Sequence, residues 1–484
     1  MNKNKGHVVM TDSNGRTRVL VVGGGPAGSV AATALAQQGI SVQLIESAQF
    51  PRYHIGESLT PSCRTILEQI GVAEKLDNHG FVIKHGGAFR WDTDSWIFDW
   101  GSQVGSRSWQ VDRSEFDLLL LNHAQDNGVK VSMGVTAKAV QFTGDRPTSV
   151  RCATDSGSLY TIDDFDYLID ATGRYGLLSA RHFKDRHPHQ NLQNVAVWGY
   201  WTGAKMLPDT PTGGINIIST PEGWFWVIPL ADGRTSIGFV TSKESFARHR
   251  QNQAPLNDIY LPLIAESPAL SDLVEDAEYQ GTAHVETDYS YVGGHFGGPG
   301  YMIVGDAACF LDPLLSSGVH LAVYSAFNAA ASIASVDRGE VTEQEALDFF
   351  EFAYRRAYTR LLALVSVMYE RYLGKDGLFH ISDRLVGATS PNPDDAPSSL
   401  SFAEIIGGVS DMREATDAGT RVLTEQLADE AFKVQQRSVS GVDGVSKPDF
   451  SSVLENPLRD AKSTEYTLVT TPRLGLARVT EPSV

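Results

Sequence analysis

The residues of this chain whose types and spacing could do chemistry begin with a glycine-rich segment. Gly23, Gly25 and Gly28 follow an apolar run at G-x-G-x-x-G spacing. The first glycine permits a tight turn, the second lets backbone approach a pyrophosphate, and the third allows a helix to pack closely on a strand. Glu46 follows 46 − 28 = 18 residues later, where a carboxylate can accept both ribose hydroxyls. This spacing predicts a dinucleotide site, and a plain strand-to-helix turn is the alternative.

Lys84 lies in the segment F-V-I-K-H-G-G that begins at Phe81. A free lysine amine has a pKa of about 10.4, so only on the order of one amine in a thousand is uncharged at neutral pH. Burial lowers a lysine pKa by up to several units. A buried Lys84 could therefore act as a nucleophile, whereas a charged Lys84 could donate a hydrogen bond to a reactant. The structural alternative is a solvated charge on a loop.

Ser317 and Gly318 stand directly before Val319 and a long apolar run. If that run is a helix, the backbone N–H groups of its first turn attract an anion, and the helix dipole adds to the attraction. We therefore expect an anion site at these residues. The alternative is an ordinary serine N-cap.

Trp224, Trp226 and Pro229 belong to the motif W-x-W-x-I-P. Periodicity alone indicates only a buried strand that ends at a proline. The two indoles are also bulky enough to wall a site from which water must be excluded.

A second strand-to-glycine turn occurs late in the chain, where residues 301–304 are followed by Gly305 and Asp306. The Asp306 carboxylate can accept hydrogen bonds from sugar hydroxyls or can cap a helix. A similar turn follows residues 167–169. A chain that combines these turns with the G-x-G-x-x-G segment resembles the glutathione-reductase-type FAD-binding fold. Arg113 resembles an arginine that such flavoproteins place near the cofactor, with a solvated helix-start charge as its alternative.

The elements that must position these residues follow from the hydrophobic pattern. Buried strands at 18–22 and 42–46 flank a helix at 29–38, which predicts a βαβ unit. Four β-rich runs separated by turn residues predict an antiparallel sheet that walls a substrate pocket; they are 195–202, 214–219, 224–229 and 235–241. The pattern then becomes helical, at 321–336, 343–372 and 402–432, with a loop at 390–399.

We therefore predict an α/β fold of the glutathione-reductase type with a substrate-side antiparallel sheet and a C-terminal helical region. Residues 1–17 are predicted to be a disordered tail. Residues 18–336 form the FAD-binding domain, with the sheet inserted at about 195–300. Residues 337–484 form the helical region and end in a polar tail.

The composition excludes several classes of protein. Lys and Arg number 40 against 58 Asp and Glu, so the formal net charge is 40 − 58 = −18, which disfavours nucleic acid and anionic membrane surfaces. Cys63, Cys152 and Cys309 show neither disulfide nor metal-site spacing, which indicates a cytoplasmic protein without a metal site. The apolar stretch near 311–334 is interrupted by polar residues, so no membrane span is expected.

Five segments together resemble those of the flavin-dependent halogenases, and the resemblance runs from Arg18 to about Phe432. It is closest to bacterial enzymes that chlorinate phenolic rings, especially the glycopeptide-antibiotic halogenases that act on tyrosine-derived units held by a peptidyl carrier protein. The five segments are the glycine-rich loop and residues 50–58, 81–87, 224–229 and 305–319; residues 354–356 and 404–410 extend the narrower likeness.

The resemblance implies an enzyme that uses FAD as FADH2, supplied by a separate flavin reductase, to make hypohalous acid from oxygen and chloride or bromide. It implies Lys84 as the catalytic residue, a halide at Ser317 and Gly318, and an active-site wall of Trp224, Trp226 and Pro229. The implied cofactor contacts are Gly23, Gly25, Ala27, Gly28, Glu46, Arg52, Arg113, Asp306 and Val319.

One departure from the family bears on the substrate. Indole-type halogenases carry a glutamate before the Ser-Thr-Gly of the late segment, and this chain has Leu315. A phenol needs less assistance than an indole, because its hydroxyl donates electrons to the ring, so free tryptophan is disfavoured. Tyr53, Glu57 and His85 are candidate bases for the phenol, although each residue type is more often structural.

Other hypotheses remain open at this stage. The substrate could be a free phenolic metabolite. Arg355, Arg356 and Arg360 could form a docking patch for an acidic carrier protein, or only a solvated helix face. An NADPH-dependent aromatic hydroxylase shares the fold, but Lys84 and the W-x-W-x-I-P motif disfavour it. A flavin-binding scaffold without turnover is a third class, which Lys84 and the Ser317–Gly318 pair also disfavour.

Overall fold

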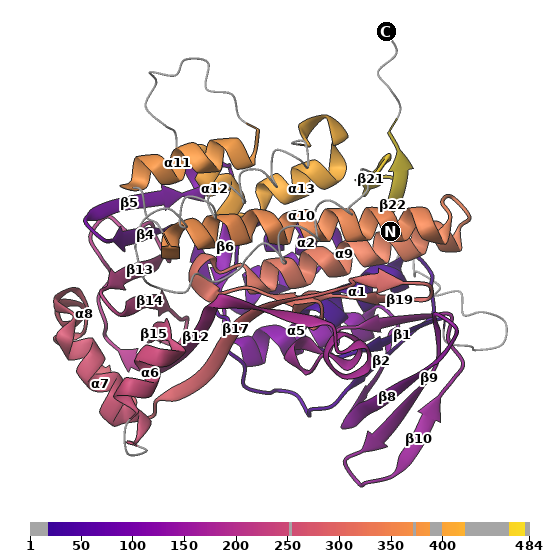
Figure 1. The fold of residues 1–484 in the computed structure, drawn as a ribbon, viewed down its shortest axis with the longest axis horizontal. Helices are drawn as coiled ribbons and strands as arrows, with labels where there is room; N and C mark the ends of the chain where they lie inside the picture. The colour runs from indigo at the N-terminus through magenta and orange to yellow at the C-terminus, as the bar shows by residue number, and fades with distance from the viewer. Residues whose placement is uncertain (1–17, 251–253, 371–373, 388–398, 422–463, 480–484) are drawn as a thin grey trace, which may run out of the picture.

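The computed structural model describes residues 18–250, 254–370, 374–387, 399–421 and 464–479. The segment predicted as a disordered tail, 1–17, lies outside the described residues, and so does the predicted loop at 390–399 apart from Ser399. Figure 1 shows the described elements as layers: two long central helices lie above the sheets, and the shorter C-terminal helices lie above these helices.

The first sheet contains the predicted βαβ unit. Its strand order is β18–β19–β11–β1–β2–β7, and every neighbouring pair is parallel except β18 and β19. The strands are β1 (Val19–Val22), β2 (Val42–Glu46), β7 (Lys130–Met133), β11 (Tyr167–Asp170), β18 (Gly297–Gly298) and β19 (Tyr301–Ile303). β1 is buried along its whole length, as an all-apolar central strand of a parallel sheet should be.

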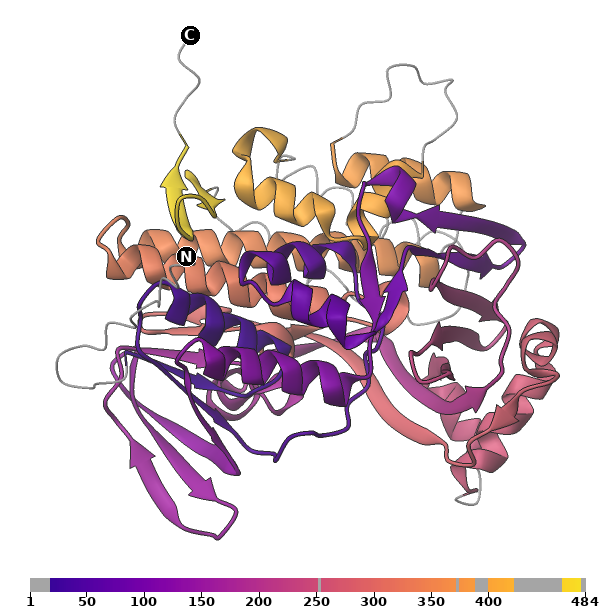
Figure 2. The ribbon, with the colours of Figure 1, turned by 180° about the vertical axis from the view of Figure 1, so that it is seen from behind.

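Helix α1 (Pro26–Gln37) begins directly after the glycine-rich turn, three residues earlier than predicted. Pro26 occupies the first turn, where its missing N–H leaves no backbone partner unsatisfied. The alanine-rich helix is almost wholly buried and packs between α5 (Arg113–Asp126) and α9 (Gly318–Asp337). In Figure 2 these indigo and purple N-terminal elements lie beneath the orange helices.

The second sheet is mixed and extends beyond the predicted insertion. Its order is β20–β17–β12–β15–β14–β13–β4–β5, with β16 paired to β12. The strands are β4 (Gly86–Trp91), β5 (Asp94–Asp99), β12 (Arg186–Thr202), β13 (Ile215–Thr220), β14 (Gly223–Pro229), β15 (Arg234–Ser242), β16 (Glu278–Tyr279), β17 (His284–Gly293) and β20 (Cys309–Phe310). The four predicted strands are confirmed, but β12 pairs with β15, and β13 pairs in parallel with β4.

The four predicted strands pair antiparallel with one another, as expected, and the sheet continues beyond the predicted insertion through the parallel pair β13–β4. The hairpin β4–β5 comes from an earlier part of the chain. Close packing requires glycine in β4, because a Cβ on Gly86 would lie 1.9 Å from the carbonyl oxygen of Phe98. These glycines weaken the strand pattern in the sequence. The insertion also holds three helices that the sequence interpretation missed, α6 (Lys243–His249), α7 (Leu256–Glu266) and α8 (Pro268–Val274).

β14 separates two hydrophobic cores. Trp224, Trp226 and Ile228 face the main core, whereas Phe225 and Val227 face a smaller core that includes residues of α6–α8. Successive side chains of a strand point to opposite faces, so this division follows from the alternation along the motif.

The described part of the C-terminal region is mainly helical, as predicted, and crosses the top of the molecule in Figure 1; residues 422–432 of the helical stretch predicted at 402–432 lie outside the described residues. It comprises α10 (Glu343–Glu370), α11 (Gly374–Leu385), α12 (Leu400–Ile406) and α13 (Val409–Thr416). The interpretation of its end as a polar tail is wrong for residues 466–478, because these form the hairpin β21 (Tyr466–Val469) and β22 (Gly475–Arg478), with Leu468 and Leu476 buried. The domain boundary near residue 336 stays a prediction.

Smaller elements complete the part that the structure describes. β8 (Val135–Thr143), β9 (Arg146–Thr154) and β10 (Leu159–Ile162) form an antiparallel sheet, and β3 (Val82–Lys84) pairs with β6 (Ser108–Gln110). Short helices are α2 (Pro61–Gln69), α3 (Ala73–His79) and α4 (Trp100–Gln103).

Helix α9 is the one described helix whose length and mean hydropathy would suffice to cross a membrane. The expectation that polar residues interrupt this apolar stretch too often for a membrane span was therefore wrong as far as length and mean hydropathy are concerned. However, 89% of the apolar window of α9 is buried inside the protein, which makes it a core helix.

Candidate functional site

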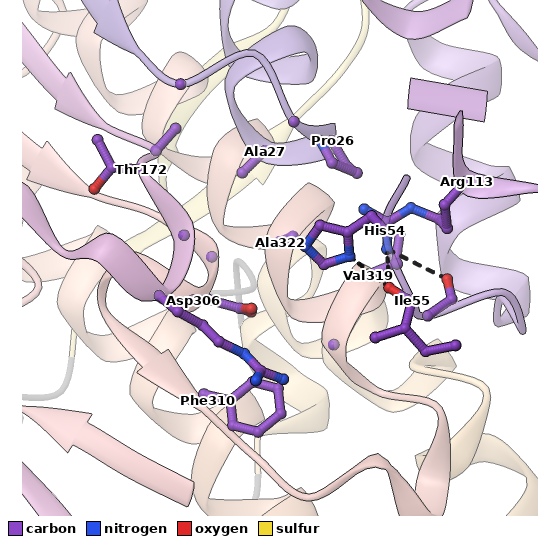
Figure 3. Close-up of a pocket in the computed structure, with 18 of the residues that line it drawn as sticks. Pro26, Ala27, His54, Ile55, Arg113, Thr172, Asp306, Phe310, Val319 and Ala322 are labelled. Carbon is purple, nitrogen blue, oxygen red and sulfur yellow. Dashed lines mark hydrogen bonds between the residues drawn. The ribbon is translucent and has the colours of Figure 1, made fainter. Parts of the chain in front are cut away.

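A large cavity lies where the two sheets meet the start of α9. It is lined from one end by the glycine-rich turn and residues 171–175. From the other end it is lined by side chains of β13 and β14 and by Phe310, Leu311, Pro313, Ser316, Gly318 and Val319. Figure 3 shows part of it, with Pro26 and Ala27 on one side, Asp306 and Phe310 on another, and His54 between them. Of the predicted site residues, those lining it are Gly23, Gly25, Ala27, Glu46, Arg52, Arg113, Trp224, Trp226, Asp306, Gly318 and Val319.

The glycine-rich turn is shaped as its spacing predicts. Gly23 has φ = +110°, a conformation that side chains rarely adopt, and a Cβ on it would lie 2.2 Å from the Ala171 carbonyl oxygen. Gly28 does not line the cavity. Its Cβ would lie 1.8 Å from the Gly23 carbonyl oxygen, which shows that it permits close packing of α1. Glu46 ends β2 and accepts the Gly24 N–H at 2.6 Å, so its carboxylate is fixed at the mouth of the turn.

Two arginines meet a buried carboxylate beside this turn. Arg113 forms an ion pair with Asp117 at 2.8 Å and donates to the Ile55 carbonyl oxygen at 2.9 Å. Arg52 approaches Asp117 at 3.2 Å, and its Nη1 is buried with no hydrogen-bond partner among the described residues. An unsatisfied guanidinium nitrogen on the wall of the cavity favours an anionic ligand.

Asp306 lies across the cavity from Arg113 in Figure 3, in the turn after β19. Burial raises the pKa of its carboxyl, against the opposing effect of Arg174, Arg113 and Arg186. The Arg174 guanidinium lies 4.3 Å from the centre of the Phe310 ring and pairs with Glu286 at 3.2 Å, so the cavity wall here is cationic and partly apolar. Sequence reasoning missed Arg174, because nothing in its local pattern distinguishes it from a surface arginine.

The start of α9 reaches the cavity through Ser316, Gly318 and Val319, whereas Ser317 is not among the lining residues, so the predicted anion site stays a prediction. Ser317 occupies the N-cap position, but its side chain makes no capping hydrogen bond, and its buried Oγ has no partner among the described residues. A Cβ on Gly318 would meet nothing within 4 Å, so the space in front of this backbone is open. The ordinary N-cap interpretation of Ser317 is therefore wrong.

Lys84 ends β3 and is 1% exposed. Its Nζ donates to the Ser58 hydroxyl at 2.6 Å and to the Leu59 carbonyl oxygen at 3.1 Å, and it lies 4.6 Å from the centre of the Trp100 ring. Desolvation lowers the pKa of this amine to about 7. Lys84 is not itself among the residues lining the cavity, but Ser58 is, so one hydroxyl separates the amine from the open space.

The W-x-W-x-I-P strand forms a wall of the cavity through Trp224, Trp226 and Ile228. Pro229 is not among the lining residues, and its assignment to the active-site wall stays a prediction. The strand alternation turns Pro229 to the opposite face from the two indoles. The indole N–H groups are both satisfied: Trp224 donates to the Tyr369 hydroxyl at 2.6 Å and Trp226 to the Ser236 hydroxyl at 3.1 Å.

Glu57 directly precedes Ser58, and its buried side chain is one of those that line the cavity. It is 3% exposed, and burial raises its pKa to about 7. Of the other two candidate bases, Tyr53 contacts Glu57 only through Tyr200, and His85 does not line the cavity. The sequence placed Glu57 in a family segment but gave no signal of its burial.

The three arginines of α10 do not form a docking patch. Arg355, Arg356 and Arg360 are 5%, 2% and 0% exposed. They pair with Glu351, Glu414 and Asp411 inside the protein. The hypothesis of a basic surface here was wrong because the acidic partners come from α13 as well as from α10, which a local charge pattern cannot show.

No group of three or more His, Cys, Asp and Glu residues that could hold a metal ion occurs in the described part of the chain. The three cysteines are buried and unpaired.

Comparisons with known proteins agree with this geometry. A family model described as an FAD binding domain matches residues 16–362. A tryptophan 2-halogenase of Chondromyces crocatus is 40% identical over 406 residues, which cover 83% of this chain and 78% of that protein. A flavin-dependent halogenase of Armillaria mellea is 38% identical over 382 residues, covering 75% and 74%.

Among solved structures, the myxobacterial chondrochloren halogenase superposes with a TM-score of 0.69 at 30% identity, and the match covers 89% of this chain and 98% of that one. The shared fold thus spans both sheets and the helices that join them.

Proposed function

The chain belongs to the flavin-dependent halogenase family, an FAD-using enzyme class, and we propose that it chlorinates a phenolic ring in natural-product biosynthesis. The family assignment follows from the similarity to its relatives. The phenolic substrate is our inference from Leu315, which is 4% exposed and stands where indole-type enzymes have a glutamate. The observation that carries the proposed chemistry is a buried amine, Lys84, held one hydroxyl away from a cavity with an open anion position at Ser317 and Gly318.

FAD fits this cavity. The close approaches at Gly23 and Gly28 leave room only for backbone around the turn, and the unsatisfied Arg52 Nη1 offers a partner to a phosphate oxygen. We assign Glu46 to the ribose, Arg52, Arg113 and Asp306 to the phosphate and sugar chain, and Val319 to the flavin end. When bound in its reduced form, FAD supplies the two electrons that, with oxygen, a proton and halide, yield hypohalous acid, water and oxidised FAD.

The residues of this chain then confine and direct the oxidised halogen. Ser317 Oγ and the backbone N–H groups that begin α9 hold the halide. Trp224 and Trp226 exclude water from the cavity, so that the hypohalous acid is not lost to solvent. Lys84 receives the halogen as an uncharged amine, or donates a hydrogen bond to hypohalous acid as an ammonium; a pKa of about 7 permits both. Flavin-dependent halogenases generally depend on a separate flavin reductase for the reduced cofactor. We propose that this protein is cytoplasmic and receives FADH2 from such a reductase.

Within the phenolic class, we propose a tyrosine-derived unit on a peptidyl carrier protein, as the resemblance to the glycopeptide enzymes implies. A free phenol is the second candidate, and the burial of Arg355, Arg356 and Arg360 favours it, because these residues cannot receive an acidic carrier. A tryptophan is the third candidate, since a relative at 40% identity is named as a tryptophan 2-halogenase.

The experiment is a substrate comparison by mass spectrometry. The purified protein, FAD, a flavin reductase with NADH, oxygen and chloride are incubated separately with tyrosyl-carrier protein, free phenols and free tryptophan. A chlorinated phenolic product supports the proposal, and its attachment to the carrier separates the first candidate from the second. Chlorination of tryptophan alone would overturn it. A parallel reaction with bromide measures the halide preference.

A further inference from the structure

Glu57 presents an unused carboxylate oxygen in the cavity wall. The Tyr200 hydroxyl donates to its Oε1 at 2.8 Å, whereas Oε2 is buried and has no hydrogen-bond partner among the described residues. The residue is 3% exposed and lines the cavity together with Gly56 and Ser58. A buried acceptor without a donor is unfavourable unless a ligand supplies one.

No ion pair to Glu57 occurs in the part of the chain that the structure describes. The charged groups that influence it are Asp112, Arg234 and Arg113, and each of these has a partner of its own. Asp112 pairs with Arg234 at 2.9 Å, and Arg113 pairs with Asp117. The hydroxyls of Tyr200 and Ser236 lower the pKa of the carboxyl, and burial outweighs them, which leaves it near the neutral range in which a base works best.

A chain of hydroxyl groups continues from Glu57 away from the cavity. The Tyr200 and Tyr53 hydroxyl oxygens are 3.0 Å apart, and the Tyr53 oxygen accepts the indole N–H of Trp198 at 2.8 Å. Tyr53 is 53% exposed. Each hydroxyl can accept a proton from one neighbour while it donates to the next, so the chain links the carboxyl with the solvent-facing loop.

Glu57 and Lys84 also act on the same part of the cavity. Ser58 follows Glu57 directly and receives the Lys84 Nζ hydrogen bond at 2.6 Å. A ring that reaches the Ser58 side of the cavity is therefore flanked by an acceptor for a proton and by the amine that directs the halogen.

We propose that Glu57 is the base that removes the hydroxyl proton of the phenolic substrate, and that Tyr200 and Tyr53 are positioning residues that pass this proton towards solvent. The proposal rests on the phenolic substrate of the proposed function. The carboxylate takes the O–H proton, and the phenolate carbon attacks the halogen. The C–X bond forms as the O–X bond of hypohalous acid breaks, and the released hydroxide combines with the proton that leaves the ring carbon to give water.

The test compares wild type with Glu57→Gln on a series of phenols of falling pKa and on an O-methylated phenol. Glu57→Gln keeps the shape of the side chain and removes its basicity. We expect about a 100-fold lower kcat on a phenol that is protonated at the assay pH. The loss should shrink as the phenol pKa falls below that pH, and it should vanish on the O-methylated ring, which has no proton to lose. FAD affinity is measured alongside.

The matched control is Glu68→Gln on an exposed helix position, where the side chain is 51% exposed, and it should leave every rate unchanged. An equal loss on phenols and on the O-methylated ring would overturn the proposal, because it would indicate a structural role. Unchanged phenol chlorination by Glu57→Gln would also overturn it and leave the proposed function intact. A wild-type enzyme that chlorinates indoles but no phenol would overturn both.

Tyr200→Phe provides an independent measurement if Glu57→Gln does not fold. Removing this hydroxyl deprives Oε1 of the Tyr200 hydrogen bond, which lowers the pKa of the carboxyl. The apparent pKa of the base should therefore rise, and the ascending limb of the pH profile of kcat should move to higher pH. Tyr279→Phe, which removes a hydroxyl bonded to Asn257, is the matched control. A Tyr200→Phe profile that coincides with that of wild type would contradict the relay.

Discussion

At the scale of single residues, Lys84 is the most informative side chain because its burial opposes its charge. In the unfolded chain the amine is protonated below about pH 10.5, whereas in the folded protein it loses its proton at about 7. Between these values the unfolded state binds one more proton, so the free energy of unfolding rises with pH over this interval.

We predict that Lys84→Met abolishes halogenation and stabilises the protein at neutral pH. The stabilisation should be on the order of 1–3 kcal/mol, because one unit of pKa corresponds to about 1.4 kcal/mol and the lost hydrogen bonds offset part of the gain. The difference should be fully present at pH 7 and below, and it should diminish as the pH rises from about 7 towards 10.5, the pKa of an unperturbed lysine. Chemical denaturation at several pH values measures it, and a Lys84→Met protein less stable than wild type at pH 7 would contradict the assigned burial cost.

Ser317 gives a second residue-scale prediction. Its unpartnered Oγ should bond the halide, so Ser317→Ala should raise the KM for chloride about tenfold, which corresponds to about 1.4 kcal/mol, while FAD affinity is unchanged. Steady-state rates at varied chloride concentration provide the measurement. A KM for chloride equal to that of wild type would show that the hydroxyl serves another purpose.

The site residues differ in how well the sequence predicts them. Gly23 and Gly28 were predictable, because a positive φ at Gly23 and a close backbone contact at Gly28 leave no room for a side chain. Glu57 and Arg174 acquire their environments from segments distant in sequence, which no local pattern contains.

At the scale of elements, a hydrogen-bonded bridge connects β14, which carries Trp224 and Trp226, to the segment before α9. The Tyr369 hydroxyl of α10 accepts from Trp224 and donates to the Asp312 carboxylate at 3.0 Å, and Asp312 precedes the segment that begins α9. Asn194 of β12 donates to the same carboxylate at 2.7 Å. Four elements are thereby fixed relative to one another around the cavity.

We predict that Tyr369→Phe loosens Trp224 without unfolding the protein. Hypohalous acid should then escape to solvent, so the ratio of halogenated product to NADH consumed should fall several-fold while the rate of oxygen consumption is unchanged. Trapping of free hypohalous acid with a soluble scavenger measures the leak. An unchanged product ratio would indicate that the bridge has no part in confinement.

Element prediction succeeded where one periodicity dominated. The βαβ unit, β12–β15 and the long helices α9 and α10 follow from runs of apolar residues. Strands β4 and β5 and the hairpin β21–β22 were missed, because glycines and polar residues mask their pattern and their stability comes from packing against distant elements.

At the scale of the whole molecule, the C-terminal helices are joined to the flavin-side helices by a buried charge network. Arg360 of α10 contacts Asp411 and Glu414 of α13, and Asp411 also accepts a hydrogen bond from His320 of α9 at 2.9 Å. All four side chains are buried. Charges of this kind fix the relative placement of helices, because an unpaired member would be strongly unfavourable.

We predict that Asp411→Ala lowers the free energy of unfolding by about 3–5 kcal/mol, since it leaves Arg360 and His320 without a shared partner. A matched change at the exposed ion pair, Glu465→Ala, should alter it by less than about 1 kcal/mol. Denaturant titration compares the two variants. Equal effects would show that the network contributes little to the architecture.

The central claim is that this chain uses its buried lysine to deliver an oxidised halogen to an aromatic ring. Its most direct test is the mass of the product formed from an accepted phenol with FAD, a flavin reductase and oxygen, with and without chloride, by wild type and Lys84→Met. We predict a chlorinated product only from wild type with chloride. Equal turnover in chloride-free buffer that installs oxygen, or full chlorination by Lys84→Met, would contradict the account.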